Sequence, residues 1–288
     1  MTQLFLAILF SSLIFIIFKL FIRFKIDTFQ AIIFNYITAA ICGFGLYSNT
    51  WVSKNLVDTQ WIPLAIVSGI LFISLFIIMG LSSQRNGVAI TSVATKMSMA
   101  TGILGMIFLY NEPTGILKIT GIIFAFVGVI AVSWKKSDSD KTQGSKWMLF
   151  VLFFGSGILD LVLNYTQKNA LGTLTSSLFS AFGLAIAGII GFIILIIQLL
   201  QGKNKLAIKN VAAGIILGIP NYFSIYMLIS SYDSTGWKDS TVLSIINVSV
   251  VLTATLLGII LFQEKFNKLK LLGLTCSILA IVLLYFSN

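Results

Sequence analysis

Ten long apolar runs, separated by short polar segments, constrain this sequence more than any other feature. A helix crosses the hydrocarbon core of a bilayer with roughly 20 apolar residues, and each run is about that long. Since 58% of the residues are hydrophobic and only 10% are charged, the chain differs sharply from ordinary soluble proteins. The sequence predicts an all-α polytopic membrane protein with ten transmembrane helices. The expected spans are 3–22, 28–47, 60–81, 87–110, 115–134, 146–167, 173–200, 210–230, 241–262 and 269–286.

The residue types that membrane enzymes use are scarce. Histidine is absent, which excludes histidine metal sites and histidine-based triads. Cys42 and Cys276 both lie inside apolar runs and are interpreted as packing residues. Only one acidic residue, Asp160, lies well inside a run, so a catalytic carboxylate pair cannot form there. We therefore expect no enzyme, no catalytic residue, no metal and no cofactor, and an intramembrane enzyme is only a remote alternative.

The basic residues indicate how the chain is oriented. Fourteen of the 19 Lys and Arg residues lie in or beside the first, third, fifth, seventh and ninth loops, and only four lie in or beside the other loops. Basic residues are retained on the cytoplasmic side, so both termini are predicted to be non-cytoplasmic. The net charge of +10 therefore indicates topology and not a nucleic-acid partner. The short loops favour a bacterial cytoplasmic (inner) membrane.

The two halves of the chain are related. The segment that begins at Ser92 recurs at Ser244, and one gap-free offset aligns charged residues and glycines as well as apolar ones. Five helices per half is an odd number, so the second half must enter the membrane from the opposite side. Inverted repeats of this kind place a site between the halves and permit alternating access. The aligned pairs are Glu112 with Glu264, Lys118 with Lys270, and Gly121 with Gly273.

The repeat defines the expected domain organisation. Residues 1–134 form the first five-helix repeat and residues 146–288 form the second. Residues 135–145 form a basic, polar linker that we expect on the cytoplasmic side.

Two short segments carry a resemblance to a known family. The fourth run ends in FLYNEPTG (residues 108–115), and the ninth run ends in LFQEKFN (residues 261–267); each is followed by a glycine-bearing helix with Gly121 and Gly128, or Gly273. In these features the chain resembles the drug/metabolite transporter superfamily, specifically the ten-helix transporters with two EamA-type repeats. The resemblance implies export of small metabolites, amino acids or toxic compounds.

Two charged residues inside the predicted spans require an explanation. Lys96 lies near the middle of the fourth run and Asp160 lies within the sixth, where an unpaired charge costs about 2.5–3.5 kcal/mol on insertion scales. A buried ion pair or a snorkelling lysine is the structural alternative. Polar residues nevertheless recur at helical spacing beside both charges, which favours a water-filled cavity. The candidate cavity residues on these stripes are Ser92, Thr95, Lys96, Asp160, Asn164, Ser244 and Asn247.

The eighth run adds two candidates. Pro220 interrupts its hydrogen bonding, and we expect Asn221 and Tyr222, which directly follow, to be candidates for contact with a ligand. Gly214 and Gly218 in the same run are typical of close helix packing.

These features together predict a secondary transporter, an exporter of small metabolites or amino acids, that works by alternating access through a central polar cavity. Lys96 and Asp160 would suit the carboxylate and ammonium of a zwitterion, and Asp160 is the carboxylate available for proton coupling. The alternative is a translocator of lipid-linked, amphipathic or drug-like substrates. The expected partners are a small-molecule substrate and the lipid bilayer, and the oligomeric state is left open.

Overall fold

The computed structural model describes residues 2–46, 60–111, 115–133, 145–170, 176–203, 205–235, 239–264 and 267–287. Within these ranges the chain forms ten helices and no strand, which confirms the predicted ten-helix membrane architecture. Nine of the described helices are long and apolar enough to cross a membrane, and the apolar stretch of α5, Ile116–Ala131, is shorter. The helices are α1 (Thr2–Arg23), α2 (Thr28–Leu46), α3 (Trp61–Arg85), α4 (Val88–Tyr110), α5 (Ile116–Ser133), α6 (Lys146–Asn169), α7 (Ser176–Leu200), α8 (Ile208–Thr235), α9 (Asp239–Phe262) and α10 (Lys268–Phe286).

Most helix boundaries fall close to the limits of the apolar runs. The largest difference is at the end of α8, which continues to Thr235 instead of ending at residue 230, because helical hydrogen bonding continues beyond the apolar residues. The helix also passes through Pro220 without ending there. The predicted linker lies outside the described residues except for Ser145.

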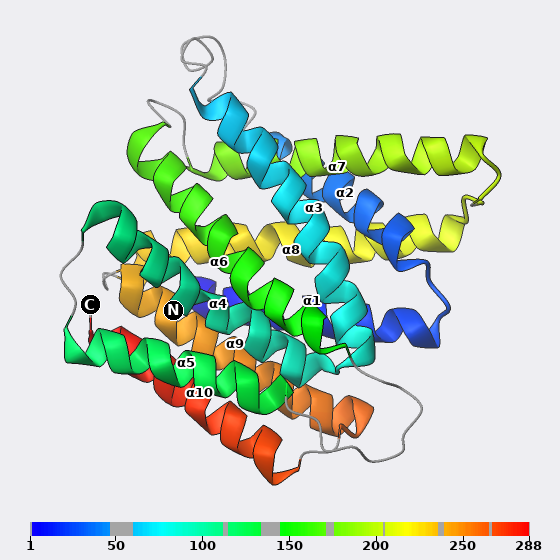
Figure 1. The fold of residues 1–288 in the computed structure, drawn as a ribbon. Coiled ribbons are helices and arrows are strands. Elements are labelled where there is room, and N and C mark those ends of the chain that lie inside the picture. The colour runs from blue at the N-terminus through cyan, green and yellow to red at the C-terminus, as the bar shows by residue number, and fades with distance from the viewer. Residues whose placement is uncertain are drawn as a thin grey trace.

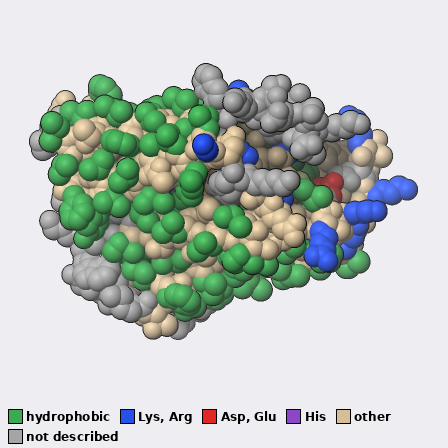
Figure 2. Space-filling view, turned by 90° about the horizontal axis from the view of Figure 1, so that it is seen from below, with side chains coloured by type: hydrophobic (Ala, Val, Ile, Leu, Met, Phe, Trp, Pro, Cys, Tyr) green, Lys and Arg blue, Asp and Glu red, His purple; other side chains and the backbone are tan. Residues whose placement is uncertain are grey.

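The two ends of the bundle differ in charge. Figure 1 shows both termini at the same end, while the α7–α8 connection lies at the other end. We call this second end the basic end, because the connections α1–α2, α3–α4, α7–α8 and α9–α10 lie there and, together with the adjoining helix ends, carry most of the described Lys and Arg residues. Figure 2 shows Lys and Arg side chains gathered mainly at one end, with apolar side chains over much of the remaining surface. Such an apolar surface suits contact with lipid.

Glycines allow several helices to approach closely. A Cβ atom at Gly218 of α8 would lie 2.7 Å from the backbone oxygen of Asn35 in α2. A Cβ atom at Gly128 of α5 would lie 3.1 Å from the backbone oxygen of Gly273 in α10. Small residues favour helix association in lipid because they let backbones pack directly against one another. The pairs α2–α8 and α5–α10 are the most extensive helix contacts in the described structure.

Helix packing follows a nearly two-fold pattern. Replacing each helix by the one five places away converts α1–α8 into α6–α3, α1–α9 into α6–α4, and α2–α8 into α7–α3, and all of these pairs are in contact. The pattern fails in several places: among the described residues the pairs α2–α3, α5–α6 and α4–α10 have no comparable equivalent in α7–α8, α10–α1 and α9–α5. It also fails beside the charged residues, since α1 packs against α3 and α4 but α6 has no comparable contact with α8 or α9. The bundle is therefore more tightly closed around α1 than around α6.

Candidate functional site

The position of Asp160 on α6 is defined by its neighbours. Ile158 and Phe154 are exposed on the outer face of α6, and Asp160 lies on nearly the opposite side at about 100° per residue. Gly157 packs against Thr101 of α4, and a Cβ atom at Gly102 of α4 would lie 3.8 Å from the Asp160 carboxylate. Asp160 is nevertheless exposed. An exposed side chain on this inward face borders space inside the bundle and does not face lipid.

Lys96 is the basic partner of this carboxylate. It lies on α4 and is half-buried, and the two charges act on one another electrostatically. In the described structure Lys96 and Asp160 are not joined by a direct ion pair of the kind that Lys19 and Glu264 form. The buried ion pair considered as the structural alternative is therefore not formed, and both charged groups remain available to a third group.

The inner face of α6 changes along its length. Toward the basic end, Leu149, Leu152 and Phe153 on this face are at most 2% exposed. Beyond them, Ser156 is half-buried and Asp160 is exposed. The interior space bordered by Asp160 therefore opens away from the basic end.

The other α4 candidates lie at different depths along this transition. Ser92 is fully buried, and its hydroxyl donates to the Ala89 carbonyl at 2.8 Å. The Thr95 hydroxyl donates to the Thr91 carbonyl at 2.9 Å, and its side chain is half-buried. Thr95 thus lies where α4 begins to border the interior space, whereas Ser92 lies in the closed segment.

The α9 candidates lie across from α4. Asn247 is buried, and its Nδ2 donates to the Met99 sulfur at 3.4 Å, one turn beyond Lys96. Ser244 falls within α9, but its side chain lies outside the described residues. The structure therefore brings Asn247 to the α4 surface that carries Lys96.

Asn164 and Asn221 retain unused hydrogen-bonding capacity. The Oδ1 atom of Asn164 and the Nδ2 atom of Asn221 are buried without a hydrogen-bond partner. A buried polar atom without a partner is costly, so each is suited to bind water or substrate. Tyr222, next in the chain, stacks on Tyr226 with ring centroids 6.0 Å apart and lies 3.2 Å from the Cβ position of Gly43 in α2. Among the described residues α8, which carries Asn221 and Tyr222, has no extensive contact with α4 or α6, which carry Lys96 and Asp160.

Sequence reasoning missed one contributor to the charged site. Ser98 lies beside the Asp160 carboxylate, and in the structure its hydroxyl donates to the Thr95 carbonyl at 2.7 Å. Ser98 falls outside the polar stripe of α4 because it is two residues from Lys96. The small residues Gly102 and Gly157, which allow α6 to approach α4, are the sequence signal that marks this contact.

Comparisons with known proteins agree with a membrane transporter. Residues 166–286 match the model of the EamA-like transporter family. An uncharacterized protein of Haemophilus influenzae is 30% identical over 294 aligned positions, which cover 99% of this chain and 98% of that protein. The probable glucose uptake protein GlcU of Priestia megaterium is 27% identical, over 73% of this chain and 74% of its own length. The glucose uptake protein GlcU of Staphylococcus xylosus is 25% identical, over 71% of each chain.

A protein solved by crystallography has a similar fold. It superposes with a TM-score of 0.61, at 10% identity, over 97% of both chains. At that identity the similarity establishes the fold alone.

Proposed function

Because the chain belongs to the EamA-like transporter family, we propose that it is a secondary transporter that moves a small polar metabolite past Lys96 and Asp160 by alternating access. The family makes the chain a membrane transporter and not an enzyme. The substrate, the direction and the coupling are the proposed part.

The observation that carries the proposal is the charge arrangement on α4 and α6. Lys96 and Asp160 are of opposite charge, lie without a direct ion pair, and border interior space at the depth where the bundle opens. Intramembrane charges are expensive and usually mark a substrate or ion pathway. A zwitterion that places its carboxylate at Lys96 and its ammonium at Asp160 would satisfy both groups at once. An amino acid is therefore the first candidate substrate.

A neutral hexose is the second candidate. Two of the relatives are named glucose uptake proteins. The unpartnered amide atoms of Asn164 and Asn221 offer an acceptor and a donor to hydroxyl groups. A lipid-linked or amphipathic substrate is the third candidate, and it would enter through the poorly packed side of α6.

Two observations support alternating access between inverted repeats 1–134 and 146–288, joined by the 135–145 linker. The first is the nearly two-fold packing pattern, which fails in several places, among them around α6. The second is the backbone at Asn111 and Gln263, which follow α4 and α9 at the repeat offset and both have left-handed φ angles, of 49° and 51°. A left-handed residue is a common helix end, and finding it at both positions is what a repeat requires. A transporter of this kind alternates between two states that open to opposite sides of the membrane. The opening away from the basic end then corresponds to one of these two states.

The proposed function also includes the orientation in the membrane, the direction of transport and the group that couples transport to protons. The basic end would face the cytoplasm of a bacterial inner membrane, with both termini on the other side. Export is the direction that the family resemblance implies, and uptake is the direction in the names of the GlcU relatives. Asp160 is the proposed coupling group if protons drive transport.

The test is a substrate screen in proteoliposomes. Vesicles containing the protein are loaded with a mixed metabolite extract, with and without a pH gradient, and depleted compounds are identified by mass spectrometry against protein-free vesicles. We expect depletion of a few amino acids, abolished by Lys96→Ala and retained by Lys203→Ala, which removes an exposed basic residue of the α7–α8 connection. Depletion of hexoses, unaffected by Lys96→Ala, would replace the zwitterion proposal with the second candidate.

A further inference from the structure

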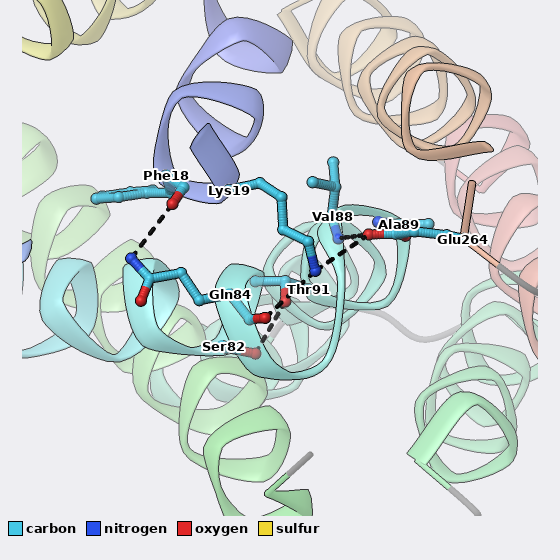
Figure 3. Close-up of polar contacts among 8 residues, drawn as sticks. All are labelled: Phe18, Lys19, Ser82, Gln84, Val88, Ala89, Thr91 and Glu264. Carbon is cyan, nitrogen blue, oxygen red and sulfur yellow. Dashed lines mark hydrogen bonds and ion pairs between the residues drawn. The ribbon is translucent and has the colours of Figure 1, made fainter. Parts of the chain in front are cut away.

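We propose that Glu264, held between the N-terminus of α4 and Lys19, is the central residue of a contact that keeps the transport pathway closed at the basic end. This inference rests on the proposed transport function. We call Lys19, Gln84, Val88, Ala89 and Glu264 the latch, and Figure 3 shows these residues together. They come from α1, α3, α4 and the α9–α10 connection.

The end of α9 directs Glu264 into this position. Gln263 adopts a left-handed φ of 51°, and the following amide, that of Glu264, donates to the Gly258 carbonyl at 3.2 Å. The chain therefore turns sharply at the helix end. Glu264 lies immediately after the turn and is only partly exposed.

The carboxylate of Glu264 fits the start of α4. One oxygen accepts from the Val88 amide at 2.7 Å and the other accepts from the Ala89 amide at 3.3 Å. The first amides of a helix have no partner within the helix, and the helix dipole favours an anion there. The carboxylate is thus a helix cap supplied from a segment 176 positions away in the chain.

Two glycines leave room for the carboxylate. A Cβ atom at Gly87, whose φ is 99°, would lie 2.7 Å from Oε1 of Glu264. A Cβ atom at Gly258 would lie 2.9 Å from Oε2. Any larger residue at either position would displace Glu264, so the local backbone is suited to hold this side chain.

Lys19 connects the latch to α1. Its ammonium lies 3.8 Å from Oε1 of Glu264 and donates to the Gln84 carbonyl at 3.2 Å (Figure 3). The Gln84 side chain in turn donates to the Thr28 hydroxyl at 2.7 Å and to the Phe18 carbonyl at 3.2 Å. Helices from both halves of the chain therefore meet at one carboxylate.

The latch lies over the closed part of the interior. The α4 segment that it caps is buried from Val88 to Ala94, and Thr95 and Lys96 follow as the first half-buried positions. Releasing the latch would separate α1 and the α9–α10 connection from α4 at the end that is now closed. Opening of this end is what the second state of alternating access requires.

The contacts of the latch are of a releasable kind. The side chains of Lys19 and Glu264 are 22% and 13% exposed, so water reaches the ion pair. Partly hydrated ion pairs contribute little net stability, because water replaces the lost contacts. The α2–α8 and α5–α10 interfaces, in contrast, are packed backbone to backbone at glycines and cannot separate without losing close contacts. Motion at the basic end is therefore expected at the latch and not at those interfaces.

The experiment measures accessibility without requiring transport. In a Cys42→Ser/Cys276→Ser background, Thr95→Cys introduces one thiol just beyond the closed segment. A membrane-impermeant thiol reagent is applied separately to each face of oriented membrane vesicles. With the latch intact we expect reaction only from the face opposite the basic end. Adding Glu264→Gln, which removes the charge and preserves the shape, should raise the rate from the basic face at least tenfold.

Controls separate a gate from general loosening. Lys268→Gln changes the charge at the same end at an exposed residue outside the latch and should leave the rate unchanged. If Glu264→Gln does not fold, Lys19→Met tests the other partner, with an expected increase of about threefold. An unchanged rate in a folded Glu264→Gln or Lys19→Met protein, or an equal increase in Lys268→Gln, overturns the latch. A faster reaction in a protein that transports no compound of the metabolite screen supports the gate and counts against the proposed substrates.

Discussion

Toward the basic end, the inner faces of α4 and α6 are buried: α4 is buried from Val88 to Ala94, and α6 is buried at Leu152. Toward the opposite end the same two helices present Lys96 and Asp160 to interior space. We call these two parts of α4 and α6 the closed half and the open half. The closed half combines apolar packing with the capped start of α4, whereas the open half holds charges without a direct ion pair. The difference between the closed and the open part of α4 and α6 teaches that one pair of helices supplies both the barrier and the candidate binding surface.

The sharpest test of this comparison uses two positions on one helix face. In the Cys42→Ser/Cys276→Ser background, Leu159→Cys in the open half should react with an impermeant thiol reagent on the order of 100-fold faster than Leu152→Cys in the closed half, because thiol reactivity depends on access. Mass spectrometry of the labelled protein gives both rates. Equal rates would remove the distinction between the halves.

Asp160→Asn should affect transport more than folding. Removing the charge leaves Lys96 without its opposite charge, and we expect transport of an identified substrate to fall roughly tenfold to 100-fold. Initial rates in proteoliposomes measure the effect, and size-exclusion chromatography checks that the protein is folded. Asp160→Glu is the matched variant and should retain part of the activity. Full activity in Asp160→Asn would contradict a role for this carboxylate.

A glycine pair compares a tightly packed position near the basic end with an open position near the opposite end. A Cβ atom at Gly80 would lie 2.9 Å from the buried ring of Phe18, so Gly80→Ala should lower the free energy of unfolding by about 1–3 kcal/mol. Gly45, near the opposite end, has no atom within 4 Å of its Cβ position, and Gly45→Ala should not destabilise the protein. Thermal unfolding in detergent compares the two variants. Equal losses would show that the space around the two Cβ positions does not decide the cost of the added methyl group.

The smallest expected effect concerns the boundary between the halves. The Thr101 hydroxyl is shared between the Ser98 carbonyl of α4, at 2.7 Å, and the Phe153 carbonyl of α6, at 3.1 Å, where the closed segment of α6 ends. Thr101→Val keeps the shape and removes this shared bond, which should cost about 0.6 kcal/mol, the average measured for interhelical hydrogen bonds in one membrane protein. The same unfolding assay measures it. A loss above 2 kcal/mol would show that this contact, and not packing, holds α6 to α4.

The fold could be predicted from the sequence because lipid requires long apolar helices, and hydropathy identifies them directly. The predicted ends failed mainly where polar residues continue a helix, as in α8 up to Thr235. The requirement to cross the membrane sets the length of the apolar part of a helix, but it does not set where a polar extension of that helix ends.

The candidate site was only partly accessible to sequence reasoning. Helical spacing predicts Ser92 and Lys96 on one face of α4, but spacing gives an angle and not a depth, so it did not predict that Ser92 lies in the closed segment. Glu264 was identified only as part of the repeat, because no local pattern shows that a carboxylate after α9 caps a helix that begins at Val88.

The close contact between α2 and α8 also has a consequence for biogenesis. Asn35 packs directly against Gly218, yet the ribosome makes these residues far apart in time, roughly 10 to 40 s at ordinary elongation rates. During that interval α2 resides in the membrane without its principal neighbour. Expression of residues 1–134 alone should therefore yield a segment that inserts but is rapidly degraded, and co-expression with residues 146–288 should rescue it.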